Sequence, residues 1–286
     1  MGVILDGKRV AEAVRREVKE RVGRFLARYG QVPGLATILI GDDPVSRVYV
    51  KTKEKACHEV GIRSFGYRLP VTATMAEVEA LLAELNTNPT VHGILLQLPL
   101  PAHLHEGQLI QALAPEKDVD GLHPLSQGKL FRGEEGLRPC TPLGVMRLID
   151  ESGIQLSGKK AVVIGRSTLV GKPVAMLLLE RNLTVTCCHS HTVDLAHEVR
   201  EADIVVAAIG QPETIKGGWI KKGAIVIDVG ISRLADGSLR GDVEFALAKE
   251  RAAFITPVPG GVGPMTVAML LANTMQAAER QMTPGR

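Results

Sequence analysis

Three lysines at alternate positions, Lys51, Lys53 and Lys55, bring amines that could act as bases into the first half of the chain. A helix is predicted over residues 44–60, and about 100° of rotation separates one side chain from the next. With Tyr49 as the reference for the inward side, Lys53 lies about 40° away, whereas the other two lysines fall on the opposite face. Lys53 is therefore predicted to be the lysine that points inward.

An inward Lys53 permits two interpretations. On an apolar face its ammonium loses hydration, which lowers the pKa and makes a neutral amine available as a base. Alternatively, the aliphatic stem lies along the core and the charged head reaches water, which periodicity alone favours. The helix itself is expected to begin with Asp43 as N-cap and Pro44 at its first position. The side of the helix that carries Tyr49 is expected to include Val45, Thr52, Ala56 and Val60.

Further polar groups follow a strand predicted over residues 91–98. Gln97 stands at the C-terminal end of this strand, where ligands of open α/β sheets gather, although an amide that only caps the turn fits as well. Asp118 and Asp120 lie in the segment KDVDG. They either form turns or face a cleft, and the sequence leaves both options open.

A glycine-rich turn in the second half predicts a dinucleotide site. A strand over residues 160–165 runs into GRSTLVGKP and then into a helix, so that backbone N–H groups and the helix dipole favour a pyrophosphate. The fingerprint is degenerate. Ser167 takes the place of the second glycine of G-x-G-x-x-G, and Gly171 comes one position late.

The next strand, over residues 184–188, indicates which dinucleotide binds. NAD sites end this strand with an acid for the ribose hydroxyls, but here CHSHT follows without one. A serine hydroxyl at Ser190 and the guanidinium of Arg166 suit the extra phosphate of NADP. We therefore predict NADP. The alternative is that Ser190 is a turn residue and Arg166 a solvated charge.

Alternating apolar strands and amphipathic helices must position these groups, which predicts an α/β fold with parallel sheets. We expect a catalytic domain over residues 1–120 and a Rossmann-type doubly wound domain over 121–263. A C-terminal helix within 264–286 should return to the first domain, and the Gly- and Pro-rich segment 115–144 should connect the two. The other predicted strands are residues 35–40, 64–69, 204–209, 224–229 and 254–257, with a helix over 75–86.

The amino-acid composition limits which classes of protein the chain can belong to. The 286 residues are 45% hydrophobic and only 3% aromatic, so the cores must be aliphatic, and a net charge of +3 does not indicate nucleic acid. No signal sequence or membrane-spanning run is apparent, which predicts a soluble cytoplasmic protein. The four cysteines lack zinc-type spacing, so no metal is expected, and they are predicted to be reduced buried thiols.

The motifs together resemble one known family. The chain carries S-x-x-Y-x-x-x-K from Ser46 to Lys53, then GILLQLPLP, EKDVDG, RPCTP, GRS-x-x-VGKP and ITPVPGGVGPMT in that order. Over essentially its whole length it is similar to the bifunctional methylenetetrahydrofolate dehydrogenase/methenyltetrahydrofolate cyclohydrolases. The resemblance implies oxidation of methylenetetrahydrofolate with NADP, hydrolysis of the methenyl product to formyltetrahydrofolate, and a homodimer. The alternatives are a monofunctional NAD-dependent dehydrogenase and a noncatalytic nucleotide-binding protein.

The resemblance also implies residue roles. Lys53 would be the catalytic lysine, assisted by Gln97, with Tyr49 packed on the folate ring system and Asp120 bonded to the pterin edge. His191 departs from the Arg or Lys of many relatives, which leaves the NADP phosphate more dependent on Arg166. Ser46, Pro259, Gly260, Gly263 and Thr266 would also line the folate pocket. Gly165, Arg166, Ser167, Ser190 and Ile231 would contact NADP.

Overall fold

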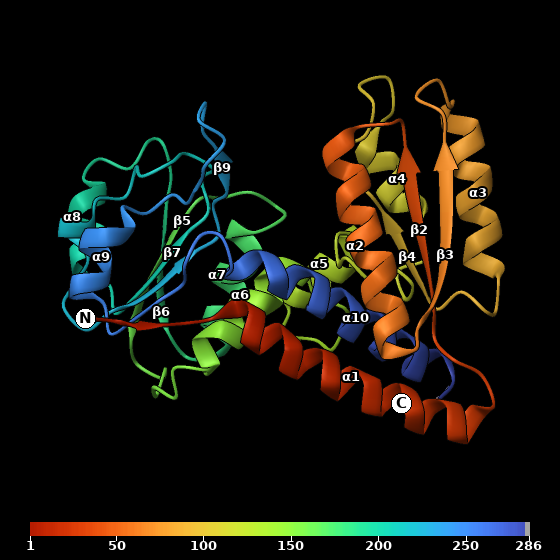
Figure 1. Cartoon of the computed structure of the whole chain (residues 1–286), viewed down its shortest axis with the longest axis horizontal. Helices are drawn as coiled ribbons and strands as arrows, with labels where there is room; N and C mark the ends of the chain where they lie inside the picture. Colours follow the sequence, from red (N-terminus) through yellow and green to blue (C-terminus); the bar gives the residue numbers. More distant parts are fainter. Residues whose placement is uncertain (284–286) are drawn as a thin grey trace. The chain divides into compact units, whose positions relative to one another are not determined.

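The computed structural model describes residues 1–283, apart from the side chain of Val45, whose predicted inward position lies outside the described part. The chain forms two compact units, each drawn in Figure 1. The six-stranded unit consists of Met1–Glu12 and Thr141–Thr266. The three-stranded unit consists of Ala13–Cys140 and the chain from Val267 onward.

The three-stranded unit is built on a parallel sheet in the order β3-β2-β4. Its strands are β2 (Gly34–Ile40), β3 (Arg63–Leu69) and β4 (Gly93–Leu96). Every residue of β2 is buried, as expected of the central strand of a covered parallel sheet. Figure 1 shows α2 and α3 beside this sheet. The helices of this part of the chain are α1 (Gly7–Tyr29), α2 (Pro44–Val60), α3 (Met75–Thr87), α4 (Glu106–Ala112) and α5 (Pro124–Phe131).

The six-stranded unit has the order β1-β11-β8-β7-β5-β6, and all its strand pairs are parallel. Its strands are β1 (Val3–Ile4), β5 (Lys160–Ile164), β6 (Thr184–Cys188), β7 (Ile204–Ala207), β8 (Ile225–Asp228) and β11 (Phe254–Ile255). Around them lie α6 (Cys140–Asp150), α7 (Gly171–Glu180), α8 (Leu195–Glu201), a 3₁₀ turn η1 (Gly217–Trp219), the hairpin β9 (Ser232–Arg233) with β10 (Leu239–Arg240), α9 (Phe245–Arg251) and the start of α10 (Val262–Gln281).

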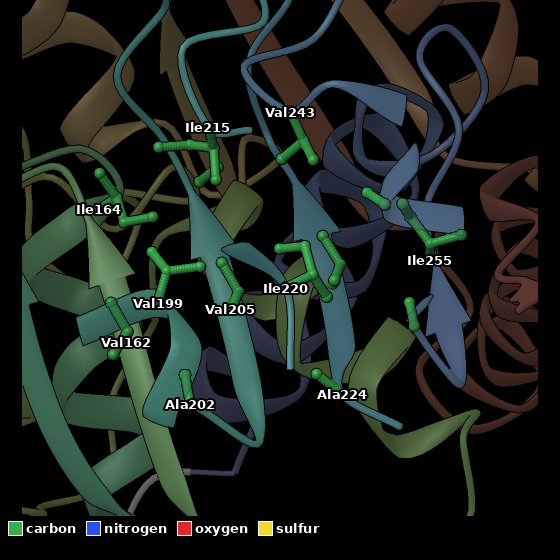
Figure 2. Packing of buried hydrophobic residues seen from close by; sticks show 14 of the residues in the cluster. Val162, Ile164, Val199, Ala202, Val205, Ile215, Ile220, Ala224, Val243 and Ile255 are labelled. Atoms are coloured by element: carbon green, nitrogen blue, oxygen red, sulfur yellow. The ribbon is translucent and has the colours of Figure 1, made fainter. Parts of the chain in front are cut away.

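Aliphatic side chains on one face of the six-stranded sheet form a continuous core (Figure 2). Val162 of β5, Val205 of β7 and Ile255 of β11 are at most 3% exposed. Val199 of α8 packs against the same cluster and is fully buried. Since burying one such side chain contributes about 1.5–3 kcal/mol, these short apolar strands supply the rigid base on which the loops of this unit stand.

The strand order creates a switch point between β5 and β7. From β5 the chain passes to β6 on one side of the sheet, and then returns to β7 on the other side of β5. In open α/β sheets the loops that leave neighbouring strands at such a point diverge, and their carboxyl ends flank a ligand-binding crevice. The loops after β5 and β7 therefore occupy the position predicted for a dinucleotide.

Most predicted elements are confirmed, but one predicted connection contains helices, and the short elements α4 and β1 were not predicted. The segment 115–144 is not a simple connection, since it contains α5 and the start of α6. α5 has only eight residues, with Gly128 inside it and His123 as its N-cap, so its periodicity is hidden from the sequence. β1 has only two residues, which form a strand because β11 lies beside them. Within residues 1–283, no helix has the length and apolar character needed to cross a bilayer.

The compact units also divide the chain differently from the predicted domains. The first twelve residues belong to the six-stranded unit, because β1 pairs with β11. Residues 121–140 belong with the three-stranded unit rather than with the predicted dinucleotide-binding domain. The expected return of the last helix is confirmed, since the chain from Val267 onward belongs to the three-stranded unit. The remainder of the predicted terminal segment, residues 284–286, lies outside the described residues.

Candidate functional site

Helix α2 holds Lys53 on its buried side. Its N-terminus is fixed as predicted, because Asp43 Oδ2 accepts the backbone N–H of Ser46 at 2.7 Å. Lys51 and Lys55 are exposed, whereas Lys53 is half-buried. The buried row of α2 therefore runs through Lys53, and its other members include Ser46, Val50, Cys57 and Val60.

Tyr49 does not mark the centre of the buried side, although it served as the reference for the prediction. Its side chain is 49% exposed, and Thr52, which was expected to point inward with it, is exposed as well. The buried arc is rotated toward Lys53, which strengthens the selection of that lysine. Tyr49 lies at the edge of this arc, where its ring remains accessible.

The amine of Lys53 is directed at the end of strand β4. Lys53 Nζ donates a hydrogen bond to Gln97 Oε1 at 2.8 Å, and Gln97 Nε2 donates to the carbonyl of Leu98 at 2.6 Å. The second bond fixes the orientation of the amide, so its oxygen faces the amine. Gln97 therefore does more than cap the turn, and the head of Lys53 has a specific partner within the protein.

Burial and the neighbouring charges shift the pKa values of Lys53 and Asp120 in opposite directions. Burial lowers the pKa of Lys53, although Asp120 and Cys140 act in the opposite direction. Burial likewise raises the pKa of Asp120, and the nearby Lys53 ammonium works against that rise. Since both shifts favour the uncharged forms, the arrangement favours a neutral amine more than an exposed lysine does. A neutral amine held by an amide oxygen can position water and accept a proton.

The two aspartates of KDVDG have different surroundings. Asp118 is 1% exposed, and its Oδ2 accepts the backbone N–H of His123 at 2.7 Å and the hydroxyl of Ser126 at 3.2 Å. Asp118 is thus the turn-forming acid that starts α5. Asp120 is the acid that acts electrostatically on Lys53. The turn-forming option is confirmed for Asp118, whereas a cleft position for Asp120 stays a prediction.

The sequence did not identify two residues of this cluster. Cys140 was expected to be only a buried thiol, but it is electrostatically coupled to Lys53 and Asp120, and its Sγ lies 3.2 Å from the carbonyl oxygen of Val119. Asn273 Nδ2 donates to the carbonyls of Val119 and Arg138, both at 2.8 Å. Asn273 therefore holds the backbone on the N-terminal side of both Asp120 and Cys140. Its only signal in the sequence is a polar pair, Asn273-Thr274, in an apolar helical row.

The glycine turn after β5 has the shape of a phosphate cradle. Gly165 has a φ of +123°, and a Cβ there would lie 2.2 Å from the carbonyl oxygen of Ala208. A Cβ at Gly171 would lie 2.2 Å from the carbonyl oxygen of Gly165. Gly171 therefore allows α7 to approach the strand closely, although it comes one position late in the sequence. Only glycine fits at these two positions, which brings the backbone of the turn close to the strand and helix, as the phosphate-binding turns of such sheets require.

The other predicted cofactor residues lie on loops of the same unit. Arg166 and Ser167 are exposed on the turn after β5, and Ser167 Oγ accepts the N–H of Val170 at 3.2 Å. Ser190 is exposed in the turn that follows β6. Ile231 follows β8 and is 45% exposed. These loops leave the carboxyl edge of one sheet, which is the edge that ligands of such sheets use.

The predicted folate-lining residues of the C-terminal half belong to the six-stranded unit. Pro259, Gly260 and Gly263 lie in the turn before and at the start of α10, and Thr266 Oγ1 lies 2.9 Å from the hydroxyl oxygen of Thr141. The turn is tight, because a Cβ at Gly261 would lie 2.6 Å from the carbonyl oxygen of Pro257. That these residues line one pocket with Lys53 stays a prediction.

Two further observations concern the exposure of the cysteines and the side chains that could bind a metal ion. All four cysteines are free, but Cys187 is exposed, contrary to the expectation of buried thiols, because β6 is an edge strand. Among residues 1–283, no group of three or more His, Cys, Asp or Glu side chains could hold a metal ion.

Comparison with known proteins agrees with this geometry. Residues 5–120 match the model of the tetrahydrofolate dehydrogenase/cyclohydrolase catalytic domain, and residues 139–282 match that of the NAD(P)-binding domain. The bifunctional protein FolD of Anaeromyxobacter dehalogenans is 58% identical over 278 residues, which cover 97% of this chain and 98% of the relative.

Solved structures with the same fold include two at more than 40% identity. The bifunctional FolD dehydrogenase/cyclohydrolase of Campylobacter jejuni has a TM-score of 0.96 and 46% identity, covering 98% of this chain and all of that one. The Trypanosoma brucei enzyme, solved with NADP cofactor and an inhibitor, has a TM-score of 0.94 and 44% identity, with 98% of each chain covered. The chain therefore belongs to the tetrahydrofolate dehydrogenase/cyclohydrolase family.

Proposed function

We propose that this enzyme oxidises methylenetetrahydrofolate to methenyltetrahydrofolate with NADP and then hydrolyses the product to formyltetrahydrofolate, within one-carbon folate metabolism. The chain carries both domains of the family over nearly its full length. The observation that carries the proposal is the hydrogen bond from Lys53 to Gln97 beside Asp120, since this cluster supplies the base that the hydrolytic step needs.

The six-stranded unit is proposed to bind the cofactor. The turn at Gly165 and Gly171 fits a pyrophosphate, because a Cβ at either position would meet backbone atoms. Arg166 and Ser190 would hold the extra phosphate of NADP, and Gly165, Ser167 and Ile231 would contact the rest of the dinucleotide. When bound, NADP⁺ supplies the hydride acceptor of the oxidation. The protein's own task in that step is to align the two reactants.

The three-stranded unit is proposed to carry out the hydrolysis. The methenyl group is a delocalised cation, and a neutral Lys53 does not repel it as an ammonium would. Lys53 Nζ, held by Gln97, would position a water molecule against the cationic carbon and accept the proton that the water loses. The remaining hydroxyl proton passes to one folate nitrogen as the carbon–nitrogen bond to it breaks, which leaves the formyl group on the other nitrogen.

The remaining residue roles are part of the same proposal. Tyr49, accessible at the edge of the buried arc of α2, would pack on the folate ring system. Asp120 would bond the pterin edge, with Ser46 nearby on α2. Pro259, Gly260, Gly263 and Thr266 would also contact the folate.

A coupled assay tests this function and distinguishes it from its rivals. Purified enzyme is supplied with methylenetetrahydrofolate and either NADP⁺ or NAD⁺, while reduced cofactor and methenyl absorbance are followed separately. We expect faster turnover with NADP⁺ and subsequent loss of the methenyl signal. Accumulation of methenyl product with a preference for NAD⁺ would identify a monofunctional dehydrogenase. Absence of turnover with both cofactors would indicate a noncatalytic nucleotide-binding protein.

We also propose that the enzyme is a homodimer of the cytoplasm. β6 is an edge strand, and its residues Thr184–Cys188 carry no charge or proline to block pairing with another strand. An exposed free thiol at Cys187 suits a reducing compartment. Sedimentation of the wild type and of Thr186→Lys tests the first part, since a lysine on this edge should favour the monomer.

A further inference from the structure

Two buried carboxylates lie behind the loops of the proposed cofactor site. Asp228 ends strand β8 and is 4% exposed, and Asp242 follows β10 and is fully buried. Buried carboxylates are costly unless strong hydrogen bonds satisfy them. The backbone N–H groups that bond to Asp228 and Asp242 show which segments these two carboxylates hold in place.

Asp242 binds the loop that leaves strand β7. Its Oδ2 accepts the backbone N–H of Ile209 at 2.7 Å and of Gly210 at 3.1 Å, and its Oδ1 accepts that of Gln211 at 2.8 Å. Three successive N–H groups therefore converge on one carboxylate. This arrangement fixes the course of the loop without any regular secondary structure.

Asp228 in turn fixes Asp242. Its carboxylate accepts the backbone N–H of Asp242 and of Val243, both at 2.9 Å. It also accepts the N–H of Gly230 at 3.1 Å, which belongs to the turn leading to Ile231. One pair of acids thus holds the loop after β7 and the turn after β8 together.

Gly230 and Gly241 leave space for the carboxylates of Asp242 and Asp228. A Cβ at Gly230 would lie 2.1 Å from Asp242 Oδ1, and a Cβ at Gly241 would lie 2.0 Å from Asp228 Oδ2. Both glycines have backbone conformations that do not themselves require glycine, since neither has a positive φ. The close approach of the carboxylates is therefore what excludes a side chain at each position.

The loop held by Asp242 forms one side of the proposed cofactor site. Ala208 lies at the start of this loop. A Cβ at Gly165 would lie 2.2 Å from the carbonyl oxygen of Ala208, which excludes a side chain at Gly165. This contact lies at the switch point between β5 and β7, where the dinucleotide is proposed to bind. A shift of residues 209–211 would therefore alter the wall that faces the glycine turn.

We propose that Asp242, supported by Asp228, is a positioning residue for NADP: its carboxylate holds the 209–211 loop and the 230–231 turn in the binding conformation before the cofactor arrives. The inference rests on the proposed function, since it assumes that NADP binds at the glycine turn. A carboxylate suits this task because it only accepts hydrogen bonds. An amide in its place would turn its own N–H donors toward some of the loop N–H groups.

The test compares Asp242→Asn with Asp236→Asn in the full-length enzyme. Asp236 is an exposed carboxylate that also accepts a backbone N–H, from Ser238, so it is a matched control outside the site. NADPH fluorescence titration gives Kd, and methenyl hydrolysis is measured without nucleotide. For Asp242→Asn we expect Kd and the KM for NADP to rise about tenfold or more, with hydrolysis unchanged. The control should match the wild type in all three.

Each outcome has a defined meaning. If the wild type itself fails to bind NADPH, the proposed function is wrong and not merely this inference. If the wild type binds and a folded Asp242→Asn binds equally well, the positioning role is wrong. A parallel loss of NADPH binding and of hydrolysis would also overturn it, because Lys53 belongs to the other unit and a selective effect is required.

Hydrogen exchange on the wild type keeps the proposal testable if the variant does not fold. The amides of residues 209–211 should be protected in the cofactor-free enzyme and gain little protection when NADPH is added. Rapid exchange of these amides without NADPH, followed by protection on binding, would show that the cofactor and not Asp242 organises the loop.

Discussion

Lys53 Nζ lies 2.8 Å from Gln97 Oε1, although 44 residues separate the two in the chain. The contact joins helix α2 to the carboxyl end of strand β4. An amine half-buried beside an amide oxygen and a carboxylate has a different chemistry from the two exposed lysines on the same helix. The following predictions test that difference and the site around it.

The rate of methenyl hydrolysis should depend on pH through Lys53. Burial lowers the pKa of Lys53, and the carboxylate of Asp120 raises it again by favouring the ammonium. Hydrolysis at saturating substrate should therefore rise as Lys53 loses its proton, along a limb below the ordinary lysine pKa. Asp120→Asn removes the stabilising charge, so the limb should move to lower pH. A limb that moves to higher pH would contradict the assignment.

Asn273 should matter for stability and for hydrolysis together. Asn273→Ala leaves the buried carbonyls of Val119 and Arg138 without their donor, which should lower the free energy of unfolding by about 2–3 kcal/mol. Denaturant unfolding measures this change. Hydrolysis should fall as well, because the backbone that carries Asp120 loses its anchor. Gln276→Ala, a half-buried change on the same helix, is the control and should cost less than about 1 kcal/mol.

The glycine turn should not tolerate a methyl group. Gly165→Ala places a Cβ 2.2 Å from the carbonyl oxygen of Ala208 at a φ of +123°, so the enzyme should lose about 2 kcal/mol or more of stability and bind NADPH weakly. Gly218→Ala is the control, since nothing lies within 4 Å of its Cβ position. Equal thermal unfolding and equal NADPH affinity for the two variants would exclude the close approach described for Gly165.

His191 should set how strongly the enzyme distinguishes NADP from NAD. It follows Ser190 in the exposed turn after β6, where the extra phosphate is proposed to bind. His191→Arg supplies a permanent charge with several N–H donors, so kcat/KM for NADP⁺ over that for NAD⁺ should rise by about three- to tenfold. The ratio at low and high salt measures the effect. An unchanged ratio would place the phosphate away from this turn.

The sequence predicted the parts of the fold that depend on local pattern. Local sequence is enough to predict a continuous apolar strand such as 35–40 or a helix cap such as Asp43. The burial and hydrogen bonding that produce these features act within a few residues. β1 and α5 could not be predicted in this way. β1 is stabilised by β11, which is distant in sequence, and the eight residues of α5 are too few to show a clear helical period.

The same distinction holds for the site. Lys53 could be selected from helical geometry, but its partner Gln97 and its neighbour Cys140 are distant in sequence and come close to it only in the folded chain. Tyr49 was a misleading reference, because periodicity gives angles between side chains and does not give the direction of the core. Asp118 and Asp120 lie two positions apart with identical chemistry, and only the tertiary hydrogen bonds of Asp118 separate their roles.

Lys53→Met compared with Lys51→Met tests the central claim most directly. Both variants lose one ammonium from α2, but Lys51 is exposed and Lys53 contacts Gln97. Methenyl hydrolysis and NADP-dependent oxidation are measured on the same preparations. Lys53→Met should lose hydrolysis by about a hundredfold or more while keeping part of its dehydrogenase activity, and Lys51→Met should keep both. Wild-type hydrolysis by Lys53→Met would contradict the role assigned to Lys53.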